Sequence, residues 1–156
     1  MRHSAIVADR LATAGLVLPP APAAIGQYVP AVRAGGLVFT SGQLPTRDGA
    51  LLTSGLVGVD VSETVAFECA KQAALNALAA ASTVCQLDAV SRVVKLVGYV
   101  ASASRFISQP AVVNGASEVL MVAFGDAGAH AREAVGVARL PLDAPVEVSL
   151  VLALES

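Results

Sequence analysis

The feature that most limits the fold of this chain is a long stretch, residues 61–84, that is rich in alanine and contains neither glycine nor proline. Asp60 precedes Glu63 by three residues, a spacing typical of a capping box, in which two side chains satisfy free backbone N–H groups at a helix start. The pattern therefore predicts a long helix that begins at Asp60. Small apolar residues fill two adjacent stripes along it and give it an apolar face wide enough to lie on a β-sheet.

Segments before and after this helix supply the predicted sheet. Two short β-rich runs are divided by Gly35-Gly36, a spacing that suits a hairpin. The valine-rich run at 90–100 alternates poorly, so we expect a strand that is buried on both faces. The predicted strands are 29–33, 37–41, 90–100, 132–140 and 146–155, with one further short strand before the long helix.

A second helix is predicted between Pro110, which suits a first helical turn, and Gly125, which suits a helix end. Gly115 lowers the helix propensity within it. The resulting order, β-β-(β)-α-β-α-β-β, predicts an α+β fold with one sheet and with helices on one face of that sheet. The other face of such a sheet needs a partner.

The N-terminal residues form a separate segment. Ser4 can cap a short helix that runs to about Ala14, and the prolines at 19, 20 and 22 impose extended backbone after it. We therefore expect one domain over residues 1–156, with a helical appendage at 1–18 and a core at about 22–154. Deletion of residues 2–15 is expected to leave the fold intact.

The balance of apolar and charged residues predicts self-association. Hydrophobic residues make up 55% of the chain and charged residues 14%, and the mean hydropathy is +0.69. That is too little polar side chain to coat an ordinary monomer of this size. Part of the apolar surface is therefore expected to be buried between subunits.

The sequence argues against membranes and nucleic acids as partners. The apolar run at 11–32 is broken by four prolines, and the run at 72–87 is shorter than the roughly 18 residues that a spanning helix needs. Asp9 and Arg10 stand where a secretory signal would be apolar, so we expect a cytoplasmic protein. Ten basic and twelve acidic residues give 10 − 12 = −2, without a basic cluster for a phosphate backbone.

No cofactor or metal is predicted. His3 and His130 are far apart in the sequence and belong to no metal-spaced set. Dinucleotide, P-loop and nucleophile-elbow motifs are absent. Cys69 and Cys85 are 16 residues apart along one predicted helix, about 24 Å at 1.5 Å per residue, so we expect free thiols.

Arg132 and Glu147 are the unusual polar residues of the two C-terminal strands, since both stand in apolar, β-prone sequence. In an antiparallel pair they would lie on neighbouring strands. One interpretation is a partly buried ion pair, because a buried guanidinium is costly unless an acid meets it. The other is an arginine that binds a ligand carboxylate, with Glu147 holding a proton or a water nearby.

Four segments carry a resemblance to a known family: Ala21 to Val29, Phe39-Thr40-Ser41-Gly42-Gln43, Ala131 to Pro141, and Val146-Glu147-Val148. Together they resemble the reactive intermediate deaminase (Rid) superfamily, formerly called the endoribonuclease L-PSP family. The C-terminal segments are the more specific ones. The N-terminal helix and the extra length indicate a longer subgroup of that family.

The resemblance implies a chorismate-mutase-like fold and a homotrimer with clefts between subunits. It also implies hydrolysis of 2-imino or enamine acids to 2-keto acids and ammonia. By the same resemblance Arg132 binds the substrate carboxylate, Glu147 orients the attacking water, Tyr28 and Ser41 line the cleft, and Asn114 matches an asparagine of the second helix.

Two departures from the family pattern accompany the resemblance. Ala134 replaces the cysteine or small polar residue that often stands two positions after the arginine, and Glu133 places an acid directly beside Arg132. Strand alternation should turn Glu133 to the opposite face of the sheet.

Two other functions remain open at this point. One is a carboxylate-metabolite binding or regulatory module that uses the same cleft without turnover. The other is a ribonuclease, which the acidic charge balance disfavours.

Overall fold

The structure is a computed structural model that describes residues 5–21 and 26–156. A five-stranded sheet with the order β1-β2-β7-β5-β6 forms its centre, β5 and β6 are parallel, and the other neighbours are antiparallel. A small second sheet is the β3–β4 hairpin. The elements are α1 (Ile6–Thr13), β1 (Ala31–Ala34), β2 (Leu37–Thr40), β3 (Thr46–Arg47), β4 (Ala50–Leu51), α2 (Glu63–Ala81), β5 (Val90–Ala101), α3 (Gln109–Phe124), β6 (Ala131–Val137) and β7 (Val146–Leu154). The predicted α+β class is confirmed, but the structure has two short strands, β3 and β4, where one was predicted before the long helix.

The long helix begins later than the sequence predicted. Its N-cap is Ser62, whose hydroxyl accepts a hydrogen bond from the Val65 N–H at 3.1 Å. The Asp60 carboxylate instead accepts the Leu56 N–H at 2.9 Å and so stabilises the preceding turn. The predicted Asp60–Glu63 capping box is wrong because the acidic side chain is used one turn earlier in the chain.

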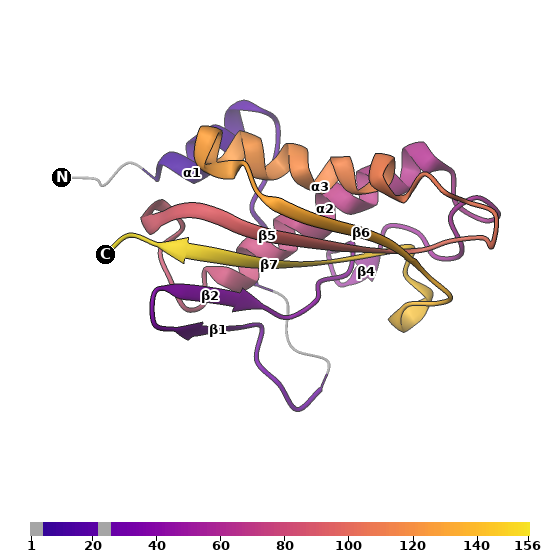
Figure 1. The fold of residues 1–156 in the computed structure, drawn as a ribbon, viewed down its shortest axis with the longest axis horizontal. Helices are drawn as coiled ribbons and strands as arrows, with labels where there is room; N and C mark the ends of the chain where they lie inside the picture. The colour runs from indigo at the N-terminus through magenta and orange to yellow at the C-terminus, as the bar shows by residue number, and fades with distance from the viewer. Residues whose placement is uncertain (1–4, 22–25) are drawn as a thin grey trace.

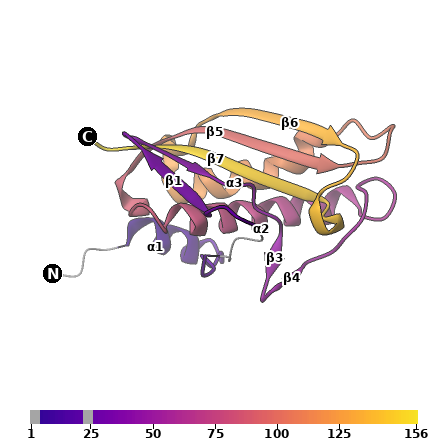
Figure 2. The same ribbon diagram turned by 90° about the horizontal axis from the view of Figure 1, so that it is seen from below.

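Helices α2 and α3 lie side by side on one face of the sheet, as Figures 1 and 2 show. The core between the layers is apolar and includes the fully buried Val38, Leu96 and Leu150. Gly115 is required where the helices cross, because a Cβ there would lie 2.2 Å from the Phe67 carbonyl oxygen. The residue that weakened the helix prediction is therefore the one that allows α3 to approach α2.

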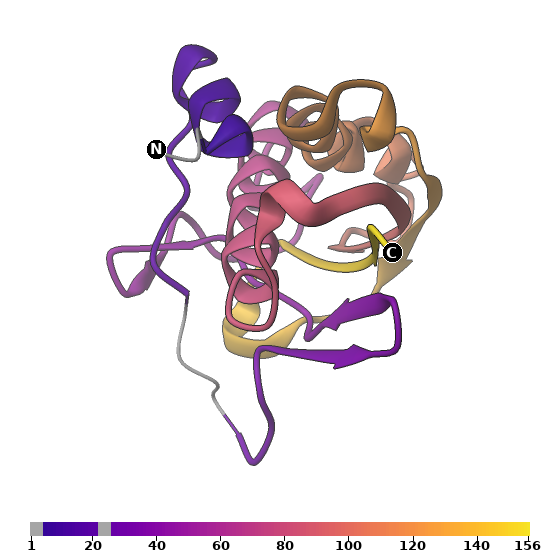
Figure 3. The same cartoon turned by 90° about the vertical axis from the view of Figure 1, so that its left-hand side faces the viewer.

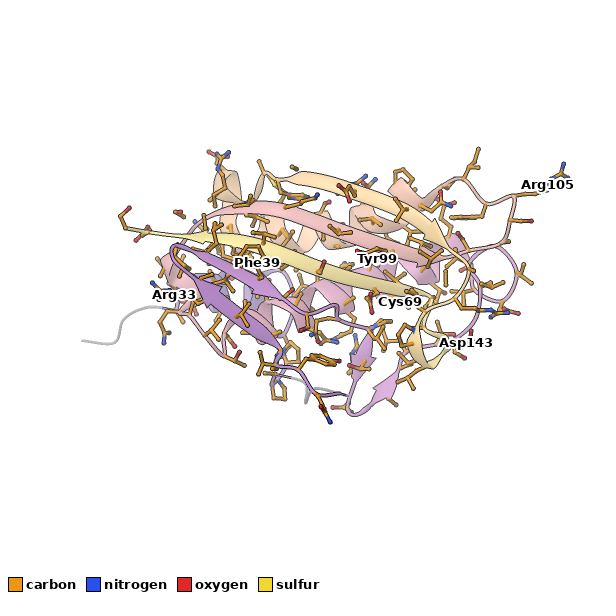
Figure 4. All side chains as sticks on the ribbon, turned by 60° about the horizontal axis from the view of Figure 1, so that its bottom comes forward. Arg33, Phe39, Cys69, Tyr99, Arg105 and Asp143 are labelled. Carbon is orange, nitrogen blue, oxygen red and sulfur yellow. The ribbon has the colours of Figure 1, made fainter. Side chains whose placement is uncertain are left out.

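No helix within residues 5–21 and 26–156 covers the other face of the sheet, and Figure 4 turns this open face toward the reader, with Phe39 and Tyr99 labelled. Burial alternates along much of β5, so the prediction that this strand is buried on both faces is wrong for the single chain. Val32, Phe39 and Val135 are exposed apolar residues of the same sheet. The open face is therefore apolar enough to be covered by another protein surface.

Helix α1 is part of the core and not a mere appendage. Val7 and Leu11 are buried in the main hydrophobic cluster, and α1 packs beside α3 (Figure 3). The Asp88 carboxylate accepts the N–H groups of Ile6 and Val7 at 3.1 and 2.9 Å and caps the helix from elsewhere in the chain. The predicted cap, Ser4, and the predicted core start at Pro22 lie outside the described residues. The buried side chains argue that deletion of α1 destabilises the fold.

Both cysteines are free, as predicted. Burial raises the pKa of the Cys69 thiol to about 11, which makes it a poor nucleophile at neutral pH. Within residues 5–21 and 26–156, no helix has the length and apolar character needed to cross a membrane.

Candidate functional site

Arg132 stands on β6, the edge strand of the sheet, and its side chain is directed to the helix layer. It is paired in register with Leu96, which faces the core. Its Nη1 donates to the Asn114 Oδ1 at 2.7 Å and to the Ser117 Oγ at 3.2 Å. Nη2 donates to the Pro110 carbonyl at 3.4 Å. Three acceptors on α3 therefore hold the guanidinium at the end of a partly buried side chain.

His130 orients one of these acceptors, the Ser117 hydroxyl. The His130 Nδ1 lies 2.6 Å from the Gly128 carbonyl oxygen, which can only accept, so Nδ1 carries the hydrogen. In the neutral ring Nε2 then accepts the Ser117 hydroxyl at 2.9 Å. Ser117 is thereby turned so that its oxygen faces Arg132. We call Asn114, Ser117, His130 and Arg132 the arginine cluster.

Sequence reasoning missed Ser117 and His130. The available signals were weak: Ser117 follows Asn114 by three residues on one helix face, and His130 stands just before β6, two residues before Arg132.

Glu147 stands on β7, in the interior of the sheet, and is paired with Tyr99 on the open face. Its carboxyl lies against Gly42, where a Cβ would be 2.7 Å from the Glu147 Cδ, so a side chain at position 42 would displace it. Burial raises the pKa of the Glu147 carboxyl above its usual value. This carboxyl can therefore exchange a proton at a higher pH than an exposed one.

Ser41 directly follows β2, and Tyr28 lies in the bend that precedes β1. The Ser41 hydroxyl donates to the Val29 carbonyl at 2.7 Å, and the Ser41 N–H donates to the Pro30 carbonyl. Tyr28 is the residue before Val29, and half of its surface is exposed. We call Tyr28, Ser41, Gly42 and Glu147 the glutamate cluster.

The structure does not bring Arg132 and Glu147 together in one chain. Their strands are separated by β5, and the two side chains leave opposite faces of the sheet. The prediction of neighbouring strands is wrong, and so is the alternative of an ion pair between them within the chain. The direction expected for Glu133 is confirmed, because its carboxylate binds the Lys95 ammonium at 2.7 Å on the open face.

Arg132 has no acidic partner among the residues that the structure describes. The ion pairs found there are Glu68–Lys71, Lys95–Glu133 and Arg139–Asp143. A partly buried guanidinium that is fixed by neutral acceptors keeps its positive charge available for an anion. Over residues 5–21 and 26–156, no group of three or more His, Cys, Asp or Glu is arranged to hold a metal ion.

The model of a family described as "YjgF/chorismate_mutase-like, putative endoribonuclease" matches residues 8–154. This chain belongs to the Rid superfamily. The Rid protein is also similar to a curated relative, Protein TCP17 of Trypanosoma cruzi, at 39% identity over 152 residues, which cover 96% of this chain and 95% of that one.

Solved structures of similar proteins agree with this assignment. Atu1372 of Agrobacterium tumefaciens, a protein of unknown function, is 39% identical with a TM-score of 0.88, over 96% of the Rid protein and 93% of that chain. A putative endoribonuclease of Shewanella oneidensis is 34% identical with a TM-score of 0.91, over 95% and 99%. E. coli TdcF with bound serine is 26% identical with a TM-score of 0.63, over 87% and 94%.

Proposed function

We propose that this Rid protein hydrolyses reactive 2-imino acids, and the enamines in equilibrium with them, to 2-keto acids and ammonia. The observation that carries the proposal is the Arg132 guanidinium, which is held by Asn114 and Ser117 and forms no ion pair with any acid among the described residues. A substrate carboxylate is the anion that this fork would accept. The serine bound to TdcF, also a small carboxylate, supports the same assignment.

The reaction needs an oriented substrate and water, and one carboxyl group that can accept and return a proton. Water adds to the carbon of the protonated C=N bond, and the Glu147 carboxylate takes the proton that the water releases. The resulting carbinolamine receives that proton from Glu147 on its nitrogen. As the C–N bond breaks and ammonia leaves, the regenerated Glu147 carboxylate takes the hydroxyl proton and the C=O bond forms. Burial raises the pKa of Glu147, so its carboxylate is a better proton acceptor than that of an exposed glutamate.

A complete site requires two copies of the chain. Arg132 and Glu147 lie on separate strands and opposite faces, so one substrate contacts both only if a neighbouring chain brings its glutamate cluster to the arginine cluster. The apolar open face supplies a surface for such assembly. We infer a homotrimer with three clefts between subunits, in the cytoplasm, where amino-acid metabolism generates imines.

Ammonia release from freshly generated 2-iminopropanoate tests the activity. The expected result is a rate above uncatalysed hydrolysis that is lost in Arg132→Ala, while RNA incubated with the same protein stays intact. A wild-type rate equal to the background would overturn the proposal in favour of a carboxylate-binding module.

Mixed assemblies test whether the site is shared. Arg132→Ala and Glu147→Gln chains, each inactive alone, are coexpressed with different tags and purified as mixed oligomers. If the two residues act from different chains, random mixing restores ½ × ½, or roughly one quarter, of the wild-type sites. If both residues acted from one chain, no intact site could form and the mixture would stay inactive.

A further inference from the structure

A cavity lies apart from both clusters, between α2, the β3–β4 hairpin and the segment that follows α1. Its volume is about 760 Å³, and it shares no lining residue with the arginine or the glutamate cluster. Figure 3 shows the segment after α1 descending past α2 on the side where the hairpin projects. Sites for small molecules commonly have volumes of roughly 300–1,000 Å³.

The wall of this cavity carries a chain of polar side chains that is fully hydrogen-bonded. The Asn76 Nδ2 donates to the carbonyls of Leu44 and Thr46 at 2.8 and 2.9 Å, and its Oδ1 accepts from the Gln72 Nε2 at 3.0 Å. Gln72 and Asn76 are only 5% and 2% exposed. Their amides are therefore locked in one orientation, with the Gln72 carbonyl oxygen directed outward.

Arg47 is held at the end of this chain. Its Nε and Nη2 both donate to the Gln72 Oε1, at 3.1 and 2.9 Å. A guanidinium has five N–H donors in one plane, so the edge formed by Nη1 and the outer hydrogen of Nη2 remains directed away from Gln72. An exposed arginine is ordinarily mobile, and here two buried amides fix its orientation in advance.

The remainder of the lining is largely apolar, with Leu16, Leu18 and Leu75 among its residues. Asp48 also lines the cavity and would repel a second negative charge. We propose that this cavity binds a small monocarboxylic acid with an apolar body. Its carboxylate is held by the free edge of Arg47, and its body lies against the leucines.

Titration calorimetry with hexanoate tests the site in full-length protein that carries Arg132→Ala, so that carboxylate binding at the arginine cluster does not interfere. Saturable binding is expected, with methyl NMR shifts at Leu16 and Leu75. Arg47→Gln should weaken it by roughly 10-fold or more, because a charge-assisted contact is lost. Arg105→Gln, which removes a positive charge from an exposed loop far from the cavity, should leave it unchanged.

A second variant keeps the test decisive if Arg47→Gln unfolds. Gln72→Glu preserves side-chain size but places a carboxylate against Arg47, so hexanoate binding should be lost. Hexylamine, which carries a positive charge, should not bind. Succinate, which carries two carboxylates, should not bind either. Absence of saturable hexanoate binding, equal binding by hexylamine, or binding that survives Gln72→Glu in a folded protein would each overturn the proposal. None of these outcomes depends on deaminase activity.

Discussion

The two faces of the central sheet are made by the same strands, and yet they differ in how far their apolar side chains are buried. On one face, residues such as Leu96 and Leu150 are sealed beneath α2 and α3. On the other face, Phe39 and Val32 remain 39% and 50% exposed. The covered face is completed within one chain, whereas in the proposed homotrimer the open face is covered by a neighbouring chain. The proposed site follows this division, with Arg132 directed to the helix layer and Glu147 to the open face.

The largest effect is expected from a charge on the open face. Phe39→Asp should prevent assembly, because a carboxylate in an apolar interface would be desolvated without a partner. Light scattering should then show a mass near 15.6 kDa, and deaminase activity should fall to background. Val65→Asp is the matched control, since Val65 is similarly exposed, at 44%, but stands on α2. Equal behaviour of the two variants would contradict the assigned role of the open face.

Glu147→Gln should reduce kcat by roughly 100-fold with less effect on KM, because general acid–base groups contribute about that much or more. In the wild type, kcat should rise with pH as Glu147 ionises, at a pH above that of an exposed carboxyl. Initial rates from pH 4 to 9 measure both. A wild-type profile that stays flat across this range would argue against Glu147 as the proton acceptor.

The same carboxyl also affects stability, with a definite sign. Its folded-state pKa is raised, so the folded state binds the proton more tightly than the unfolded state, and stability falls as pH rises through the folded pKa. Glu147→Gln should therefore raise Tm at pH 8, and the gain should vanish at pH 4. Thermal melts of both proteins at these two pH values measure the difference.

Arg132→Lys is expected to lower kcat/KM by roughly 10-fold or more while assembly persists. Lysine keeps the charge but loses the planar two-point contact with a carboxylate, and one charge-assisted hydrogen bond contributes about 1.5–3 kcal/mol. Steady-state kinetics on 2-iminopropanoate, with light scattering for assembly, provide the measurement. Full activity in this variant would make Arg132 a structural residue.

The smallest change is expected at Ser117, which contacts Arg132 and would not contact substrate. Ser117→Ala removes one neutral acceptor and should raise KM by roughly 2- to 10-fold, from about 0.5–1.5 kcal/mol for one hydrogen bond. The control is Ser91→Ala, whose hydroxyl donates to the Ala153 carbonyl on another part of the sheet. If both variants behaved alike, the arginine cluster would have no special role in positioning.

The family segments and local patterns identified several of the residues in the two clusters. Gly35-Gly36 and Gly125 correctly marked a hairpin and a helix end, because backbone conformation at such positions depends on the residue itself. Glu147 was singled out as an unusual polar residue of an apolar strand, whereas Tyr28 and Ser41 came from the family resemblance, and the three lie in one part of the fold. Asn114, which the family resemblance also named, accepts a hydrogen bond from Arg132.

Strand order was beyond the sequence, and it decided how the site is divided. Sequence spacing suggested that β6 and β7 are neighbours, but β5 pairs with both and separates Arg132 from Glu147. The caps behaved similarly: Asp88 caps α1 from 82 residues away, which no local pattern encodes. The sequence by itself determined the fold class, the hairpin and the residue types that the chemistry needs, since these depend on local propensity and periodicity. Which side chains share a face or an edge was decided only by tertiary pairing, because strand partners are selected by burial of the whole sheet.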